Sequence, residues 1–194
     1  MNIGIYLYDQ AEVLDFSGPY GVFSTAARLC SPLQPFEVFL VSESGRTVTA
    51  RGGFSVNPAY SFLNHPPIDV MIIAGGEHQA ELSKSAVLRW IKTTSAQAQH
   101  VASVCTGAFL LAQAGVLHHQ RATTHWEDIP DLRAAYPDLQ VLEQQRWVED
   151  GKFISSAGIS AGIDMSLYLL SKIHSRTLAE QTARQMEFSW TLNS

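Results

Sequence analysis

The stretch Val101-Ala102-Ser103-Val104-Cys105-Thr106-Gly107-Ala108-Phe109 decides how the chain folds. An apolar run typical of a buried strand stops at Cys105, and small residues follow at once. Gly107 and Ala108 allow a helix to begin against a sheet with no bulky side chain in between. This is the strand–nucleophile–helix arrangement of a nucleophile elbow, although the letters are not G-x-S-x-G. The stretch therefore predicts a thiol that projects from the C-terminal edge of a sheet.

Short apolar runs alternate with helical patterns along the rest of the chain. Strands are expected at Asn2–Tyr8, Phe36–Ser42, Asp69–Ala74 and Val101–Val104. Helices are expected at Ser17–Leu29, Ala80–Gln97, Thr106–Ala114, Ser160–Ile173 and Thr177–Trp190. Hairpins are expected within Arg46–Tyr60 and around Asp150-Gly151. This alternation predicts an α/β fold with a doubly wound, mostly parallel sheet sandwiched by helices. With no repeat or linker, residues 1–194 are expected to form one domain.

Composition limits the partners and the compartment. The chain has 13 basic and 18 acidic residues and no Lys/Arg cluster, so nucleic-acid binding is not expected. No apolar run reaches the ~18 residues that a transmembrane helix needs, so no membrane span is expected. The start, Met1–Tyr8, is strand-like and lacks the features of a signal peptide, so a cytoplasmic location is expected. Metal-ligand spacings such as H-E-x-x-H are absent, and neither a metal nor another cofactor is expected.

The two cysteines are expected to have different roles. Cys105 lies at the start of a predicted helix, where partial positive charge favours a thiolate. The alternative is that Cys105 is a small buried apolar residue, as most free cysteines are. Its place at a strand end favours the reactive interpretation. Cys30 lies at a helix end before Ser31-Pro32 and is expected to be structural.

Asp15 stands in an otherwise apolar stretch, Val13-Leu14-Asp15-Phe16, just after the first predicted strand. It could cap the helix expected to start near Ser17, since Asp is a good N-cap residue. It could also serve as a general acid or base, because burial among apolar side chains raises the pKa of a carboxyl group. The two roles are compatible.

Glycines follow a second buried strand at Gly75-Gly76. Their backbone N–H groups, together with that of Thr106, could form an oxyanion hole. An ordinary turn that uses glycine for a positive φ is the alternative. Small residues recur around Gly158, Ile159 and Ser160, where a predicted helix begins. They permit either close approach to a substrate or tight packing of a helix on the sheet.

Histidines offer a partner for the thiol. His125 follows the predicted strand Arg121–Thr124 and could pair with Cys105, or it could pack under Trp126. His78, just past the glycine pair, is a weaker candidate.

These segments resemble the ThiJ/PfpI superfamily, which has the flavodoxin-like fold of class I glutamine amidotransferases. The resemblance rests on five segments that span nearly the whole chain: Leu14–Pro19, Ala74–Gly76, Val104–Ala108, Arg121–Trp126 and Ala157–Asp164. The isocyanide hydratase subgroup is the most similar in these motifs. The resemblance implies a homodimer that acts on a small molecule, with Cys105 as nucleophile and Asp15 as its acid/base partner. Gly75, Gly76, Thr106 and the Gly158–Ser160 backbone would line the pocket.

Differences from other branches of the ThiJ/PfpI superfamily narrow the range of expected activities. Members that resemble intracellular proteases have a His directly after the Cys, whereas this chain has Thr106, so peptidase activity is not expected. The oxidation-sensing branch has a Glu where this chain has Asp15. The motifs also resemble the ligand-sensing part of AraC-type regulators, which carry a C-terminal DNA-binding domain. No such domain follows here, and a stand-alone enzyme is the favoured expectation.

Three functions remain open at this point. The leading hypothesis is hydration of an isocyanide to an N-substituted formamide, with Cys105 attacking the terminal carbon and Asp15 moving protons. Backbone N–H groups near Gly76, Thr106 and Ile159 would stabilise developing charge. The second hypothesis is glyoxalase- or deglycase-like action on 2-oxoaldehydes. The third is non-enzymatic, either a redox sensor or a ligand-binding regulatory domain.

Overall fold

The computed structural model describes residues 1–33 and 35–193. At its centre is a seven-stranded sheet in the order β10-β11-β7-β6-β1-β2-β5. All neighbouring strands run parallel except β10, which pairs antiparallel with β11. The strand bounds are β1 Asn2–Tyr6, β2 Glu37–Ser42, β5 Tyr60–Ser61, β6 Val70–Ile73, β7 His100–Val104, β10 Trp147–Asp150 and β11 Phe153–Ser156. The predicted α/β class with a mostly parallel sheet is confirmed.

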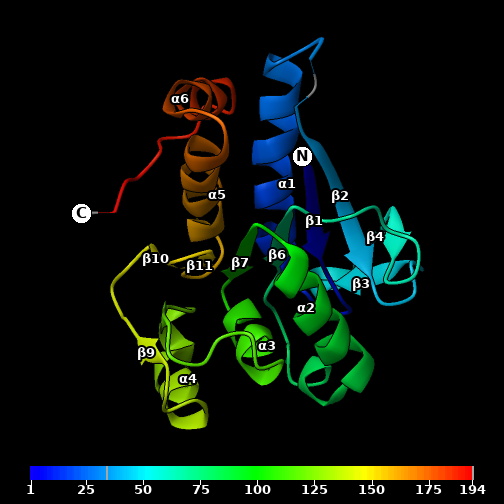
Figure 1. Ribbon diagram of the computed structural model, residues 1–194, viewed down its shortest axis with the longest axis vertical. Helices are drawn as coiled ribbons and strands as arrows, with labels where there is room; N and C mark the ends of the chain where they lie inside the picture. Colours follow the sequence, from blue (N-terminus) through cyan, green and yellow to red (C-terminus); the bar gives the residue numbers. More distant parts are fainter. Residues whose placement is uncertain (34, 194) are drawn as a thin grey trace.

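Helices cover both faces of this sheet (Figure 1). On one face lie α1 (Val13–Leu29), α5 (Ala161–Ile173) and α6 (Arg176–Gln185), which pack against one another. On the other lie α2 (Ser85–Gln97) and α3 (Gly107–Gln113). Helix α4 (Ile129–Ala135) lies beside β9 (Gln140–Val141) at the lower end of the view, and β9 pairs with the short strand β8 (Arg121–Ala122).

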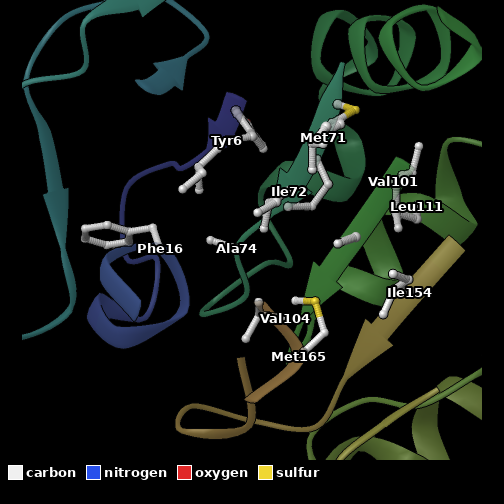
Figure 2. Packing of buried hydrophobic residues seen from close by; sticks show 14 of the residues in the cluster. Tyr6, Phe16, Met71, Ile72, Ala74, Val101, Val104, Leu111, Ile154 and Met165 are labelled. Atoms are coloured by element: carbon white, nitrogen blue, oxygen red, sulfur yellow. The ribbon is translucent and has the colours of Figure 1, made fainter. Parts of the chain in front are cut away.

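The central strands are buried on both sides, which explains their continuous apolar sequence. Every residue of β6 is buried, as are the last four residues of β7. Figure 2 shows the cluster that results, with Ile72 and Val101 from the sheet, Leu111 from α3 and Met165 from α5. Burying each such side chain contributes about 1.5–3 kcal/mol to folding.

The order of the strands places a crevice next to β1. The chain leaves β1 through α1 for β2 on one side, and leaves β6 through α2 for β7 on the other. At the carboxyl ends of β1 and β6, the loops that follow these two strands therefore run in opposite directions. Ligands of open α/β sheets bind at such a reversal of strand order.

Helix α1 begins at Val13 rather than at Ser17, so the predicted boundary is wrong and Pro19 lies inside the helix. Asp15 and Phe16 are buried with Val22 and Phe23 of the later turns. This burial holds the first turn in helical form although Pro19 can donate no backbone hydrogen bond to it.

Helix α6 ends at Gln185 rather than at Trp190, which also departs from the prediction. Glu187 has φ +50°, and Phe188 N–H donates to Ala183 C=O, which closes the helix. The two hairpins are confirmed: β3 (Val48–Ala50) pairs with β4 (Phe54–Val56), and β10 with β11 across Gly151. Among the described residues no helix has the length and apolar character needed to cross a membrane.

Candidate functional site

Cys105 sits on the sharp turn between β7 and α3, as predicted. Its φ is +55°, in the left-handed region that residues with a side chain rarely adopt. The turn is held from both sides: Cys105 N–H donates to Ser156 C=O at 3.2 Å, and Thr124 Oγ1 donates to Cys105 C=O at 2.8 Å. Gly107 follows because a side chain there would collide with Ile73 C=O. The strain is therefore maintained by the surrounding strands.

Asp15 lies beside this thiol, in the first turn of α1 and fully buried. Its Oδ2 accepts a hydrogen bond from Gly75 N–H at 3.1 Å. Its Oδ1 has no partner of normal hydrogen-bond geometry among the described residues, although the Cys105 thiol and Ile159 N–H are close enough to lower its pKa. The N-cap role considered for Asp15 is wrong, because Glu12 occupies the cap position.

Burial raises the pKa of Asp15 to about 7 from its ordinary value of 3.8. The negative charge of Glu12 raises it further, while the N–H groups of Gly75 and Ile159 and the Cys105 S–H lower it. The direction expected from the apolar sequence is confirmed. Near neutral pH this carboxyl can both accept and release a proton.

The pKa of Cys105 is also raised, against the expectation of a stabilised thiolate. Burial is the main cause, since the residue is only 7% exposed, and the charge of Asp15 is the second. The N–H of Thr106 lowers the pKa but does not outweigh them. Helix α3 has only seven residues, and desolvation outweighs what its N-terminus supplies. The resting sulfur is thus a thiol with a carboxyl group beside it.

The backbone N–H groups of the glycine pair bond to other residues of the site. Gly75 N–H is bonded to Asp15 as described above. Gly76 N–H donates to Thr106 Oγ1 at 2.9 Å, and the Thr106 hydroxyl donates back to Gly76 C=O at 2.9 Å. Both glycine N–H groups are therefore occupied by the protein, so the part of the oxyanion-hole prediction that used them is wrong, and the Thr106 N–H, which lies toward the Cys105 sulfur, is left. No Cβ fits at Gly75, where it would lie 2.7 Å from Asp15 Oδ2.

A cavity of about 750 Å³ opens in front of the thiol. Of the predicted site residues, Cys105, Thr106, Gly76, His125 and Ile159 border it. The described residues along its wall do not include Asp15, Gly75, Gly158 or Ser160. Asp15 is instead buried next to the Cys105 thiol, with the Gly75 N–H bonded to its carboxyl group.

A comparison of the sequence with protein-family models matches residues 1–172 to the DJ-1/PfpI family. This chain belongs to the DJ-1/PfpI family. It is 33% identical to isonitrile hydratase of Pseudomonas putida over 195 residues, covering 97% of this chain and 79% of the relative. It is 32% identical to the transcriptional regulator CdhR of Pseudomonas aeruginosa, over 75% of this chain but 43% of the regulator. A ThiJ/PfpI family structure from Pseudomonas syringae superposes with a TM-score of 0.87 at 27% identity, covering 98% of this chain and 76% of that one.

The small-residue segment at Gly158–Ser160 of this DJ-1/PfpI chain only partly faces the cavity. Ile159 has φ +57° and is 41% exposed at the cavity. Gly158 lies against the His125 ring, which leaves no room for a Cβ. Ser160 is at the start of α5, where its hydroxyl lies 3.4 Å from Arg146 Nη2. Gly162 meets Val104, so tight packing of α5 on the sheet accounts for this glycine.

Within the residues that the structure describes, neither His125 nor His78 forms a hydrogen bond with the Cys105 thiol. His125 Nδ1 is 3.5 Å from Asp128 Oδ2 and 3.8 Å from Glu127 Oε2, and no hydrogen bond joins it to Cys105. His78 is buried, with its ring 4.6 Å from that of Phe109. Burial lowers its pKa. In the described ranges no group of three or more His, Cys, Asp or Glu side chains could hold a metal ion.

Sequence reasoning missed several residues at the site of this DJ-1/PfpI protein. Tyr8, just after β1, is buried, and the charges of Glu81, Asp15 and Cys105 add to burial in raising its pKa. Polar residues around the cavity were also missed: Asp9, Gln10, Glu12, Arg51, Glu77, Gln79, Glu81, Lys84, Glu127 and Asp128. The rule that ligands lie beyond strand ends could have found Tyr8, Asp9 and Glu77. No local signal marked Arg51, which only the β3–β4 hairpin carries to the cavity.

Proposed function

We propose that this protein hydrates small electrophilic carbon compounds through Cys105, and that it converts isocyanides to N-substituted formamides. One observation carries the proposal: a fully buried carboxyl with a pKa of about 7 lies beside a thiol on a strained turn that borders a cavity. The likeness to isonitrile hydratase over 97% of the chain supports the choice of substrate.

In the first step ionised Asp15 takes the thiol proton as Cys105 Sγ attacks the terminal isocyanide carbon. The same proton then passes from Asp15 to that carbon. The product is a thioimidate, R–N=CH–S–Cys105, and Asp15 is again ionised. Because the thiol has a raised pKa, it needs this adjacent base to react, and general-base assistance typically contributes about 10²- to 10⁴-fold in rate.

In the second step Asp15 accepts a proton from a water molecule that attacks the thioimidate carbon. Asp15 passes this proton to nitrogen, which gives the tetrahedral intermediate R–NH–CH(OH)–S–Cys105. The C–S bond then breaks as the hydroxyl group loses its proton, and Asp15 returns that proton to the leaving sulfur. The sum is R–NC plus H₂O giving R–NH–CHO, with the enzyme unchanged. The Thr106 N–H, which lies next to the sulfur, stabilises negative charge there as the bond breaks.

The test is incubation of the protein with an alkyl isocyanide, with formamide measured by mass spectrometry. Cys105→Ala and Asp15→Asn should form formamide at background rate, while Cys30→Ala should match the parent protein. We expect activity to rise with pH through about 7, because the base must be ionised. Equal formamide yields from the parent protein and Cys105→Ala would contradict the proposal.

A second candidate is a ligand-sensing role, favoured by the likeness to the regulator CdhR. A redox version of it fits the site less well, because thiol oxidation proceeds through the thiolate and the pKa of Cys105 is raised. We expect little change in mass at Cys105 after mild peroxide treatment. Rapid oxidation there, with no turnover of isocyanide or methylglyoxal, would favour sensing instead.

A further inference from the structure

The cavity in front of Cys105 is lined by many more acidic than basic side chains. Six carboxylates border it, and two Lys/Arg side chains. The carboxylates are Asp9, Glu12, Glu77, Glu81, Glu127 and Asp128, and the cations are Arg51 and Lys84.

Both cations are already neutralised by carboxylates of the protein. Arg51 Nη1 is 3.4 Å from Glu12 Oε2. Lys84 Nζ is 2.7 Å from Glu81 Oε1, which is almost fully buried, and 3.8 Å from Glu43 Oε2. Neither offers a free positive charge to an anionic ligand.

The remaining carboxylates keep their charge toward the cavity. Within the described residues, Asp9, Glu77, Glu127 and Asp128 have no Lys or Arg partner within 4.0 Å. The ring nitrogen His125 Nδ1 lies 3.5 Å from Asp128 Oδ2 and 3.8 Å from Glu127 Oε2. The charge of Asp128 reaches the reacting atom, because it raises the pKa of the Cys105 thiol, and the opposite effect of Arg51 on that pKa is smaller. Like-charge contacts of this kind exclude a ligand of the same sign, and salt screens them over about 8 Å at physiological ionic strength.

We propose that this cavity selects neutral or cationic substrates and excludes anionic ones. The inference deepens the proposed function and rests on it for the reaction: the isocyanides hydrated would carry an uncharged or an ammonium-bearing substituent, and isocyano-carboxylates would be rejected. Glu77, Glu127 and Asp128 are the residues that set this preference.

Charge selection can be measured without any turnover. In a Cys30→Ser background only Cys105 is left to react with thiol reagents. Its rates with the methanethiosulfonates bearing ethylammonium and ethylsulfonate groups are compared, each divided by the rate with 2-mercaptoethanol. We expect the cationic reagent to be at least tenfold faster, with most of the advantage lost in 0.5 M NaCl. Equal normalised rates, or a faster anionic reagent, would overturn the proposal.

Matched variants localise the effect. Asp128→Asn combined with Glu77→Gln should lower the cation-to-anion ratio severalfold. A change in the thiol pKa affects both reagents alike and cancels in this ratio. The control is Glu180→Gln with Asp138→Asn, which changes net charge equally on residues that do not border the cavity. If the control lowers the ratio as much, net charge is the cause and the cavity is not.

A substrate series separates this inference from the proposed function. The values of kcat/KM are compared for a neutral alkyl isocyanide, an ω-ammonium alkyl isocyanide and isocyanoacetate. Hydration of the first two alone supports both proposals, and equal hydration of isocyanoacetate overturns charge selection. Hydration of none of them, with the reagent ratio retained, overturns the proposed function and leaves charge selection standing.

Discussion

Two buried aspartates, Asp15 and Asp164, show how the same side chain takes different roles in one fold. Both are fully buried, and both lie in the first turn of a helix, α1 and α5, on the same face of the sheet. Burial raises the pKa of each. They differ in their partners, and the partners decide what each carboxyl can do.

Asp164 is held by a cation and by the end of the chain. It forms an ion pair with Arg146 and accepts Thr191 N–H at Oδ1 at 2.7 Å, and its backbone C=O accepts Trp190 Nε1–H at 3.2 Å. Among the described residues no cation pairs with Asp15; the groups that act on it are the Gly75 and Ile159 N–H groups, the Cys105 thiol and the charge of Glu12. The paired carboxyl secures the segment after α6, whereas the unpaired one is free to exchange a proton.

The largest expected effect is on activity. Asp15→Asn should lower isocyanide hydration by about 10²- to 10⁴-fold, because the only carboxyl beside the thiol among the described residues is lost. Asp164→Asn should lower it far less. Initial rates of formamide formation for both variants, at equal folded fraction by circular dichroism, check this. Comparable losses in the two variants would remove the functional distinction between these aspartates.

The next effect is on stability and has opposite signs at the two positions. The folded-state pKa of Asp15, about 7, lies above the ordinary 3.8, so the stability that its neutral form contributes is complete below 3.8 and is lost as pH rises through 7. Asp15→Asn stays neutral. The free energy of unfolding of Asp15→Asn, relative to that of the parent protein, should therefore increase by about 3 kcal/mol between pH 5 and pH 8. Urea unfolding at the two pH values measures this, and an advantage that does not change with pH would contradict it.

Removal of the partner of Asp164 should destabilise the protein. Arg146→Ala leaves Asp164 buried without its cation, and breaking such pairs costs about 3–5 kcal/mol when both members are buried. Because the Arg146 side chain is 36% exposed, we expect a smaller loss of about 2 kcal/mol. Thermal unfolding is the measurement, with Arg176→Ala, which breaks an exposed ion pair with Glu180, as the control. Equal shifts in both variants would show that burial of Asp164 does not matter.

Two neighbouring tyrosines repeat the contrast on a smaller scale. Tyr6 OH donates to Glu81 Oε2 at 2.6 Å, whereas Tyr8 OH is buried with no partner of normal hydrogen-bond geometry among the described residues, although the Thr106 hydroxyl is close enough to lower its pKa. Tyr6→Phe should destabilise the protein by about 1–2 kcal/mol, and Tyr8→Phe should leave stability unchanged or raise it by up to about 1 kcal/mol. Urea unfolding of the pair tests this. A loss at Tyr8 as large as at Tyr6 would indicate a partner for its hydroxyl.

The smallest effect is a shift in the pH profile. Glu12 raises the pKa of Asp15 through its charge, so Glu12→Gln should move the rising limb of hydration activity to lower pH. The maximal rate should change little, because Glu12 does not touch the thiol. Rates across pH 5–9 for the variant and the parent protein measure the shift. A limb that moves to higher pH would rule out Asp15 as the titrating base.

Much of the fold followed from local patterns. Continuous apolar runs predicted the buried strands, and the Asp150-Gly151 pair predicted its hairpin. The boundaries that were wrong, at Val13 and Gln185, are places where long-range contacts decide. Burial of Asp15 and Phe16 allows α1 to begin before Pro19. The hydrogen bonds from Trp190 and Thr191 to Asp164 fix the segment after α6 in a non-helical course.

The sequence by itself determined the elbow at Cys105, because the backbone there depends on the residues next to it. It also indicated a carboxyl with raised pKa at Asp15, since apolar neighbours in the chain are buried together. The tertiary structure alone decided that the thiol is not ionised, that the glycine N–H groups are occupied, and that Arg51 and Asp128 share one cavity. Desolvation, hydrogen-bond partners and electric fields depend on distances in space, and residues far apart in the chain set these distances.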